Sequence, residues 1–132
     1  MPPQNAKERA QLHGAAPVFV VNDVVKSIAH YRDVLGFDAE FLYGEPTFYA
    51  GVERDAVLIH LQAARATKRR PGQASVNIFV SDVDALYEEL KSRGARILKP
   101  PKDYDYGMRD FDVLDLDGNH LSFGMESRKA TS

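Results

Sequence analysis

The stretch SVNIFVSDVDALYEELKSRG, residues 75–94, decides the fold because the chain uses its pattern twice. A shift of 59 positions places residues 79–83, FVSDV, on residues 20–24, VVNDV. The same shift places Tyr87 on Ile28 and Leu90 on Tyr31. The chain is therefore predicted to contain two copies of one structural unit.

Each copy is predicted to be a strand followed by a helix. Apolar and other side chains alternate over residues 75–80, which is typical of a strand with two different faces. Asp82 and Asp23 can cap the helices that follow, and Gly94 and Gly36 can end them. The apolar stripes of the two helices are Val24, Ile28, Tyr31 and Leu35 in the first copy and Val83, Tyr87 and Leu90 in the second.

The strand face that points away from the helices is where we expect function. Each strand must place its apolar side under its helix, so alternate side chains point to the opposite face. The same alternation holds in the later strands of each copy. The residues assigned to this open face are Ala16, Val18, Val20, His60, Gln62, Ser75, Asn77, Phe79, Asp110, Asp112 and Ser122.

The remaining sequence adds three strands to each copy, so the predicted class is α+β with the order βαβββ twice. The later strands are expected over residues 37–43, 46–53 and 56–62, then over 95–99, 108–115 and 119–125, with a loop at 99–107. We predict a flexible N-terminal tail over residues 1–14, one domain over 15–126 and a second tail over 127–132. Within the domain, repeat one spans 15–62, a basic linker 63–73 and repeat two 74–126.

Composition excludes several classes of function. The net charge of −2 and the pI of about 6.1 give no electrostatic reason to expect nucleic acid or an anionic membrane as a partner. The chain has no cysteine, which excludes disulfides, thiolate zinc sites and a cysteine nucleophile. It also lacks an apolar run of about 20 residues, so we expect a cytoplasmic protein.

Three motifs accompany the two βαβββ units: V-x-D-V at both strand-helix junctions, YRDVLGF at 31–37 and DLDGN at 115–119. Together they resemble the vicinal oxygen chelate superfamily, which includes glyoxalases, fosfomycin-modifying enzymes, extradiol dioxygenases and bleomycin resistance proteins. The resemblance covers about residues 15–125. PVF at 17–19, HLQ at 60–62 and YGMRDF at 106–111 resemble the bleomycin resistance protein branch most.

This resemblance implies two curled, mixed four-stranded sheets that form concave cups, and a homodimer with the cups near the subunit contact. It also places four metal-ligand positions at Ala16, His60, Ser75 and Ser122. Alanine has no donor atom, and serine hydroxyls are poor ligands for zinc, iron or nickel. One histidine cannot hold a catalytic divalent ion, so we expect neither a metal nor another cofactor.

We therefore expect a metal-independent binding protein of the bleomycin resistance type. It would sequester a cationic or aromatic ligand, such as a bleomycin-family antibiotic, in a dimer cleft with an acidic, aromatic lining. Asp103, Asp105 and Asp115 are expected to add to the acidic mouth. The predicted ligand-binding residues are Phe48, His60, Asn77, Phe79, Tyr104, Tyr106, Asp110, Asp112 and Ser122.

Other interpretations stay open. A metal-dependent glyoxalase or lyase could use His60 with Asp112 or Glu126 as ligands outside the family pattern. A small interaction domain with a closed cup would bind another protein instead. Simple packing could account for the aromatic residues, solvation for the aspartates, and ion pairs with neighbouring aspartates for Arg109.

Overall fold

The structure is a computed structural model that describes residues 9–127. Its elements are β1 (Val18–Val21), α1 (Val24–Asp33), β2 (Asp38–Tyr43), β3 (Tyr49–Arg54), β4 (Val57–Ala63), a short 3-10 helix η1 (Ala64–Ala66), β5 (Ser75–Phe79), α2 (Val83–Ser92), β6 (Arg96–Asp103), β7 (Met108–Leu114) and β8 (His120–Glu126). The predicted repeat is confirmed, and 59 positions separate both ends of the two helices. The expected tails lie largely outside the described residues. Neither α1 nor α2 is long and apolar enough to cross a membrane.

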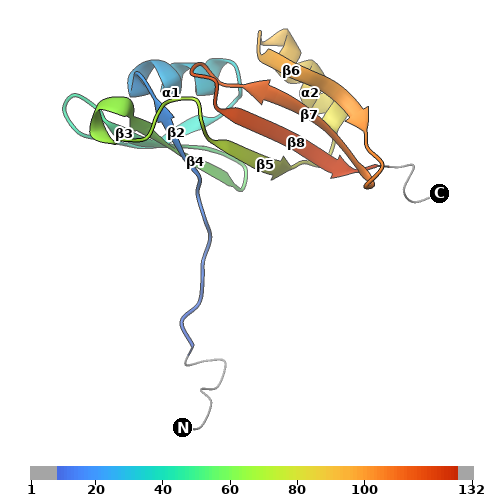
Figure 1. Ribbon diagram of the computed structural model, residues 1–132, viewed down its shortest axis with the longest axis horizontal. Coiled ribbons are helices and arrows are strands. Elements are labelled where there is room, and N and C mark those ends of the chain that lie inside the picture. The colour runs from blue at the N-terminus through green and yellow to red at the C-terminus, as the bar shows by residue number, and fades with distance from the viewer. Residues whose placement is uncertain (1–8, 128–132) are drawn as a thin grey trace.

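The strands form two mixed sheets of four, in the orders β1-β4-β3-β2 and β5-β8-β7-β6. In each sheet the first pair is parallel and the other pairs are antiparallel. Figure 1 shows the two sheets side by side along the molecule, with one helix packed against each. The sheets do not close on each other, so each keeps an open face.

The core lies between the helices and the sheets. Phe19 of β1, Tyr31 of α1 and Phe111 of β7 are fully buried in it. Each helix begins as predicted, because Asp23 accepts a hydrogen bond of 3.0 Å from the Lys26 amide and Asp82 accepts one of 3.0 Å from the Ala85 amide. The alternation that buries these residues directs the remaining strand side chains to the open faces.

Strand β6 is longer than predicted. It runs through Pro100 and Pro101 to Asp103, where the sequence suggested a loop. A strand at the edge of a sheet tolerates prolines because one side of its backbone has no ladder partner. The pairing of β6 with β7 shifts register between Ile97 and Lys99 and again between Lys99 and Lys102, which accommodates both prolines.

The turn at residues 115–119 joins the two repeats. Asp115 is only 1% exposed and accepts a hydrogen bond of 2.8 Å from the Tyr31 hydroxyl. Burial, together with the charge and the hydrogen bond of Asp115, raises the pKa of Tyr31 well above its usual value, so the phenol stays a donor. Asp117 accepts from the amide and the side chain of Asn22, at 3.0 and 2.8 Å. The expectation that Asp115 belongs to an acidic ligand mouth is therefore wrong.

Candidate functional site

A hollow of about 220 Å³ lies on the open face of the second sheet. We call it the second-sheet hollow. Five of the nine predicted binding residues line it, and they come from β5, β7, β8 and the loop before β7. These five are Asn77, Phe79, Tyr106, Asp110 and Ser122, accompanied by Ile78, Met108 and Gly124.

Strand register brings these side chains together. Strand β8 lies between β5 and β7, so Asn77 is opposite Ser122 on one side. On the other side Asp110 is opposite Gly124. Gly124 has no side chain of its own, and the Asp110 Cβ and Met108 Cε atoms lie 3.4 and 3.5 Å from where its Cβ would stand. The hollow therefore combines amide, hydroxyl and carboxylate groups with the thioether side chain of Met108.

Aromatic rings form the rim of the hollow. Phe79 is 80% exposed and Tyr106 is 68% exposed. Tyr104 stacks on Tyr106 with ring centroids 5.3 Å apart, and Lys99 and Lys102 lie 5.6 and 5.3 Å from the centroid of Tyr104. Because these ammonium groups lie against the Tyr104 ring, that ring is not free to stack on a ligand. The rings available for a flat ligand are those of Phe79 and Tyr106.

The two predicted carboxylates of β7 have different environments. Asp110 lines the hollow and accepts a hydrogen bond of 3.2 Å from the Tyr106 hydroxyl. Asp112 is only 3% exposed, with Lys99 Nζ at 3.2 Å and His120 Nε2 at 3.1 Å from its Oδ2 atom. Asp110 is therefore the carboxylate that faces the hollow, and Asp112 is held by its own neighbours.

Asp112 is expected to make the stability of the protein depend on pH. Burial raises the pKa of this carboxyl, but Ser122, Lys99 and His120 more than offset that effect and leave the pKa below its usual value. A lowered folded-state pKa gives stability that is present above the unfolded pKa of about 4 and is lost as the pH falls through the folded pKa. We expect Asp112→Asn to cost about 1 to 2 kcal/mol of unfolding free energy at pH 7.

Urea unfolding of the wild type and of Asp112→Asn at a series of pH values checks this response. The difference between the two proteins should shrink as the pH falls below about 4. A difference that stays constant from pH 7 to pH 3 would contradict the ionic role of Asp112. The conservative substitution keeps the side-chain size, so packing changes little.

Arg109 of β7 does not pair with the neighbouring Asp110 or Asp112. Its guanidinium group lies 2.7 Å from Asp84 and 3.3 Å from Asp103. These contacts tie β7 to α2 and to the end of β6. The predicted structural role of Arg109 holds, but its partners are different from those expected.

His60 lies on the open face of the first sheet, away from the second-sheet hollow. Its Nδ1 atom is 2.8 Å from the Tyr49 hydroxyl, and the Phe41 ring packs against the imidazole with centroids 5.3 Å apart. Tyr49 and Phe41 were not among the predicted site residues. Strand alternation indicates Tyr49, because it lies on the same face of β3 as Gly51, which is opposite His60. Tyr49 itself is opposite Gln62, which shares the face of His60.

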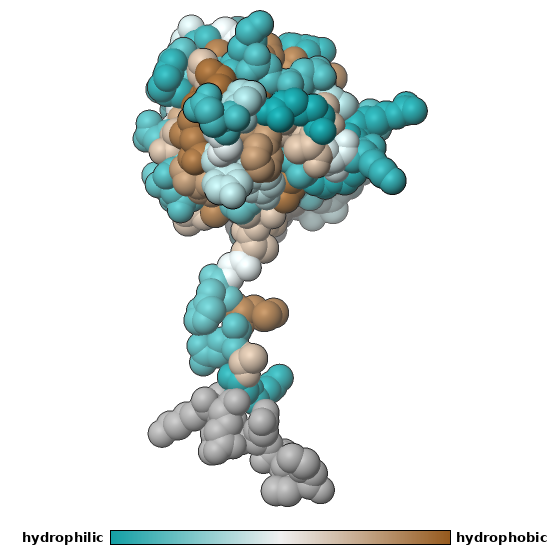
Figure 2. Space-filling model, turned by 90° about the vertical axis from the view of Figure 1, so that its left-hand side faces the viewer, coloured by the Kyte–Doolittle hydropathy of each residue, from teal (hydrophilic) through white to brown (hydrophobic). Residues whose placement is uncertain are grey.

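Phe48 occupies a position different from that of His60. It precedes β3 and packs against the core, with its ring 5.4 Å from that of Tyr43 and the Arg65 guanidinium 6.0 Å from its centroid. Figure 2 shows this first-repeat end of the molecule, where hydrophobic side chains reach the surface among hydrophilic ones. Tyr49 and Phe41, rather than Phe48, are the rings beside His60 on the open face of the first sheet.

The family metal positions do not supply a suitable set of donors. Ala16 has no donor atom, His60 already bonds to Tyr49, and Ser75 and Ser122 offer neutral hydroxyls on the other sheet. Within residues 9–127, no three His, Cys, Asp or Glu side chains are grouped so that they could hold a metal ion. The residues present therefore do not fit the metal centre of the superfamily's enzymes.

The paired βαβββ repeats, each with a mixed four-stranded sheet that keeps one face open, define an α+β class of protein. The chain belongs to the Glyoxalase/Bleomycin resistance protein/Dioxygenase superfamily, whose family model matches residues 13–123. It is 34% identical over 126 residues to the bleomycin resistance protein of Geobacillus stearothermophilus, covering 81% of this chain and 92% of that protein. A bleomycin resistance protein of Staphylococcus aureus matches equally well.

Solved structures agree with this assignment. One is a bleomycin-binding protein from the bleomycin producer Streptomyces verticillus, solved in complex with copper(II)-bleomycin. It has a TM-score of 0.73 and 28% identity, covering 87% of this chain and 97% of that one. A superfamily member from Sphaerobacter thermophilus has a TM-score of 0.75 at 23% identity, covering 87% and 98% of the two chains, and shows the fold alone.

Proposed function

We propose that the protein is a metal-independent binding protein that sequesters a cationic, aromatic ligand of the bleomycin type, as an antibiotic resistance protein does. The observation that carries this proposal is the second-sheet hollow, where Phe79 and Tyr106 present exposed rings beside the Asp110 carboxylate. Exposed rings stack on flat ligands, and a carboxylate attracts a cation. The sequence relatives named as bleomycin resistance proteins support the same ligand class.

Sequestration explains the polar groups of the hollow better than catalysis does. Catalysis of the family type needs a metal as Lewis acid, and the donor set does not fit one. The buried Asp112 is engaged by Lys99 and His120, so it is not placed as a base toward the hollow. Binding requires affinity alone, which rings and a carboxylate supply without any bond being made.

We further propose that the binding cleft forms between two copies of the chain. Each sheet leaves one face open, and large apolar side chains on or beside these faces are exposed, including Tyr43, Phe79 and Tyr106. Exposed rings of this size favour burial against a partner. A homodimer would place the open sheet of one copy over that of another and turn each shallow hollow into a cleft.

The test is a calorimetric titration of the metal-stripped protein with bleomycin and with copper(II)-bleomycin. We expect a dissociation constant on the order of micromolar or tighter, with about one ligand per chain. Asp110→Asn should weaken binding by about five- to ten-fold, because it removes the charge that faces the hollow but keeps the side-chain shape. Glu88→Gln, an exposed charge change on α2, should leave the affinity unchanged.

Two outcomes would contradict the proposal. One is the absence of binding by the stripped protein, with binding or turnover appearing on addition of zinc, nickel, manganese or iron. That result would favour the enzyme interpretation. The other is equal affinity for bleomycin in the wild type and in Asp110→Asn, which would remove the second-sheet hollow as the cation-binding surface. Sedimentation of the same samples, with and without ligand, checks the homodimer.

A further inference from the structure

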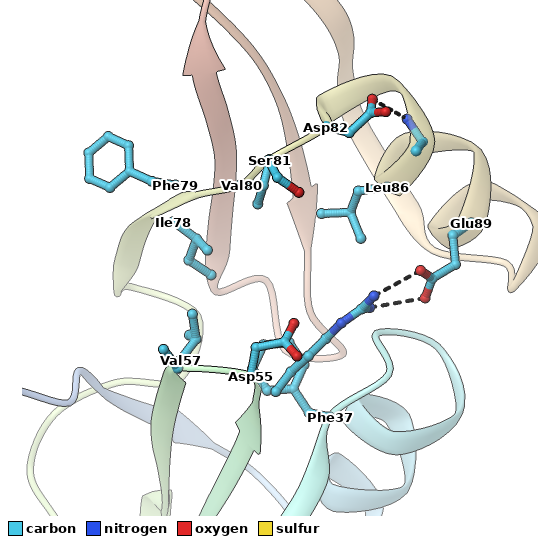
Figure 3. Close-up of a pocket in the computed structure, with 13 residues that line it drawn as sticks. Phe37, Asp55, Val57, Ile78, Phe79, Val80, Ser81, Asp82, Leu86 and Glu89 are labelled. Carbon is cyan, nitrogen blue, oxygen red and sulfur yellow. Dashed lines mark hydrogen bonds and ion pairs between the residues drawn. The ribbon is translucent and has the colours of Figure 1, made fainter.

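The two repeats meet at two joints that are related by the internal repeat. At each joint, the turn between the last two strands of a sheet faces the strand-helix junction of the other repeat. The turn at residues 115–119 fills the junction at Asn22, which we call the closed joint. The turn at residues 55 and 56 faces the junction at residues 80–82 and leaves a pocket of about 370 Å³, which we call the open joint (Figure 3).

The sequence explains why the second joint stays open. The turn between β3 and β4 consists of residues 55 and 56, whereas the turn between β7 and β8 consists of residues 115–119. The shorter turn cannot reach across to the junction. The donors that hold the longer turn are also replaced: the shift of 59 positions places Ser81 on Asn22, Leu86 on Ser27 and Leu90 on Tyr31.

The open joint combines an apolar wall with oxygen atoms at its mouth. Val57, Ile78 and Leu86 project into the space, and Figure 3 shows the carboxylate of Asp55 and the hydroxyl of Ser81 directed toward its middle. Most sites for small ligands have this composition, with a few polar groups that converge on an apolar cavity. A pocket of about 370 Å³ suits a ligand of modest size.

The other charged groups around the pocket are already engaged. Asp82 turns toward its own helix and accepts from the Ala85 amide at 3.0 Å. The carboxylate of Glu89 accepts hydrogen bonds from both terminal nitrogens of Arg54, at 3.0 and 2.8 Å. The three carboxylates and one guanidinium together give the pocket a negative balance, and Asp55 is the carboxylate left to meet a ligand.

The closed joint shows what Asp55 lacks. There, Asp117 accepts from Asn22 and Asp115 accepts from Tyr31. Asp55 occupies the equivalent turn, but within the described part of the chain no group donates a hydrogen bond to its carboxylate. We propose that the open joint is a second binding site, next to the second-sheet hollow and sharing Ile78 and Phe79 with it, for a small amphipathic cation that has a primary ammonium group on an apolar body. The ammonium donates to Asp55 and Ser81, and the apolar body packs on Leu86, Ile78 and Val57.

The probe for this site is 2-phenylethylammonium, with the neutral 2-phenylethanol as its matched control. Amide chemical shifts followed by NMR at Ser81, Ala85 and Leu86 should change and saturate with the ammonium probe. The alcohol should bind about five-fold more weakly, because it lacks the charge that pairs with a partly exposed carboxylate. Asp55→Asn should reduce the affinity for the ammonium probe to that of the alcohol.

Asparagine is the suitable replacement at this position. Asp55 has a φ of 52°, in the left-handed region, which asparagine tolerates better than other side chains do. Glu88→Gln removes one negative charge from the outer side of α2 and should leave the ammonium affinity unchanged. Equal binding of ammonium and alcohol, or an Asp55→Asn protein that binds the ammonium as the wild type does, would overturn the proposal. Shifts confined to Met108 and Asp110 would also overturn it, since they would assign the cation to the second-sheet hollow.

Discussion

Replacing Asp115 with alanine is expected to lower the free energy of unfolding by about 3 to 5 kcal/mol. Its carboxylate is buried and accepts from the Tyr31 hydroxyl at 2.8 Å, from the amides of Asn119 and Asp117 at 2.8 and 3.0 Å, and from the Asn119 side chain at 3.1 Å. Alanine would leave these donors buried without an acceptor. Urea unfolding at pH 7 measures the loss as a lower midpoint.

Two control variants test whether the loss of stability comes from the contacts of the closed joint or from a change of charge alone. Tyr31→Phe removes one donor and should cost about 1 to 2 kcal/mol, less than the loss of the acceptor itself. Asp55→Asn changes the equivalent turn of the open joint and should stay within about 0.5 kcal/mol of the wild type. If Asp115→Ala unfolds with the wild-type midpoint, the closed joint does not hold the repeats together.

Much of the fold could be predicted from the sequence because it depends on local patterns. The shift of 59 positions, the caps at Asp23 and Asp82 and the strand alternation are all visible in the sequence. The role of Asp115 was not visible. Its turn chemistry is local, but its partner Tyr31 lies 84 positions away and comes into contact with it only when the repeats pack.

The same difference, between local sequence patterns and contacts that form only on packing, explains which features of the candidate site could be predicted. Alternation correctly assigned Asp110 and Asp112 to one strand face, but it cannot say what covers that face. Lys99 comes from an edge strand whose register shifts twice, and it reaches over Asp112 and leaves Asp110 to the hollow. Phe48 lies just before β3, where the alternation of the strand does not yet apply.

Replacing Phe79 with alanine is expected to weaken bleomycin binding by about ten- to thirty-fold while it changes the stability by less than about 0.5 kcal/mol. The internal repeat gives the reason. Val20, the counterpart of Phe79 in the first repeat, is only 3% exposed, and its carbonyl accepts a hydrogen bond from Asn119 at 3.0 Å. Phe79 is 80% exposed although its side chain is larger. A ring at this position contributes little to the fold of the single chain and is available to stack on a ligand.

Calorimetric titration of the Phe79→Ala protein with bleomycin, together with urea unfolding, measures both quantities. Val25→Ala is the matched control, because it removes an exposed apolar side chain on α1 and should leave the affinity unchanged. Phe79 also lines the open joint, so Asp55→Asn is titrated beside it. Loss of bleomycin affinity in Phe79→Ala with retention in Asp55→Asn assigns the ring to the second-sheet hollow. Unchanged affinity in Phe79→Ala would contradict the proposed stacking, and equal losses in both variants would place bleomycin in the open joint instead.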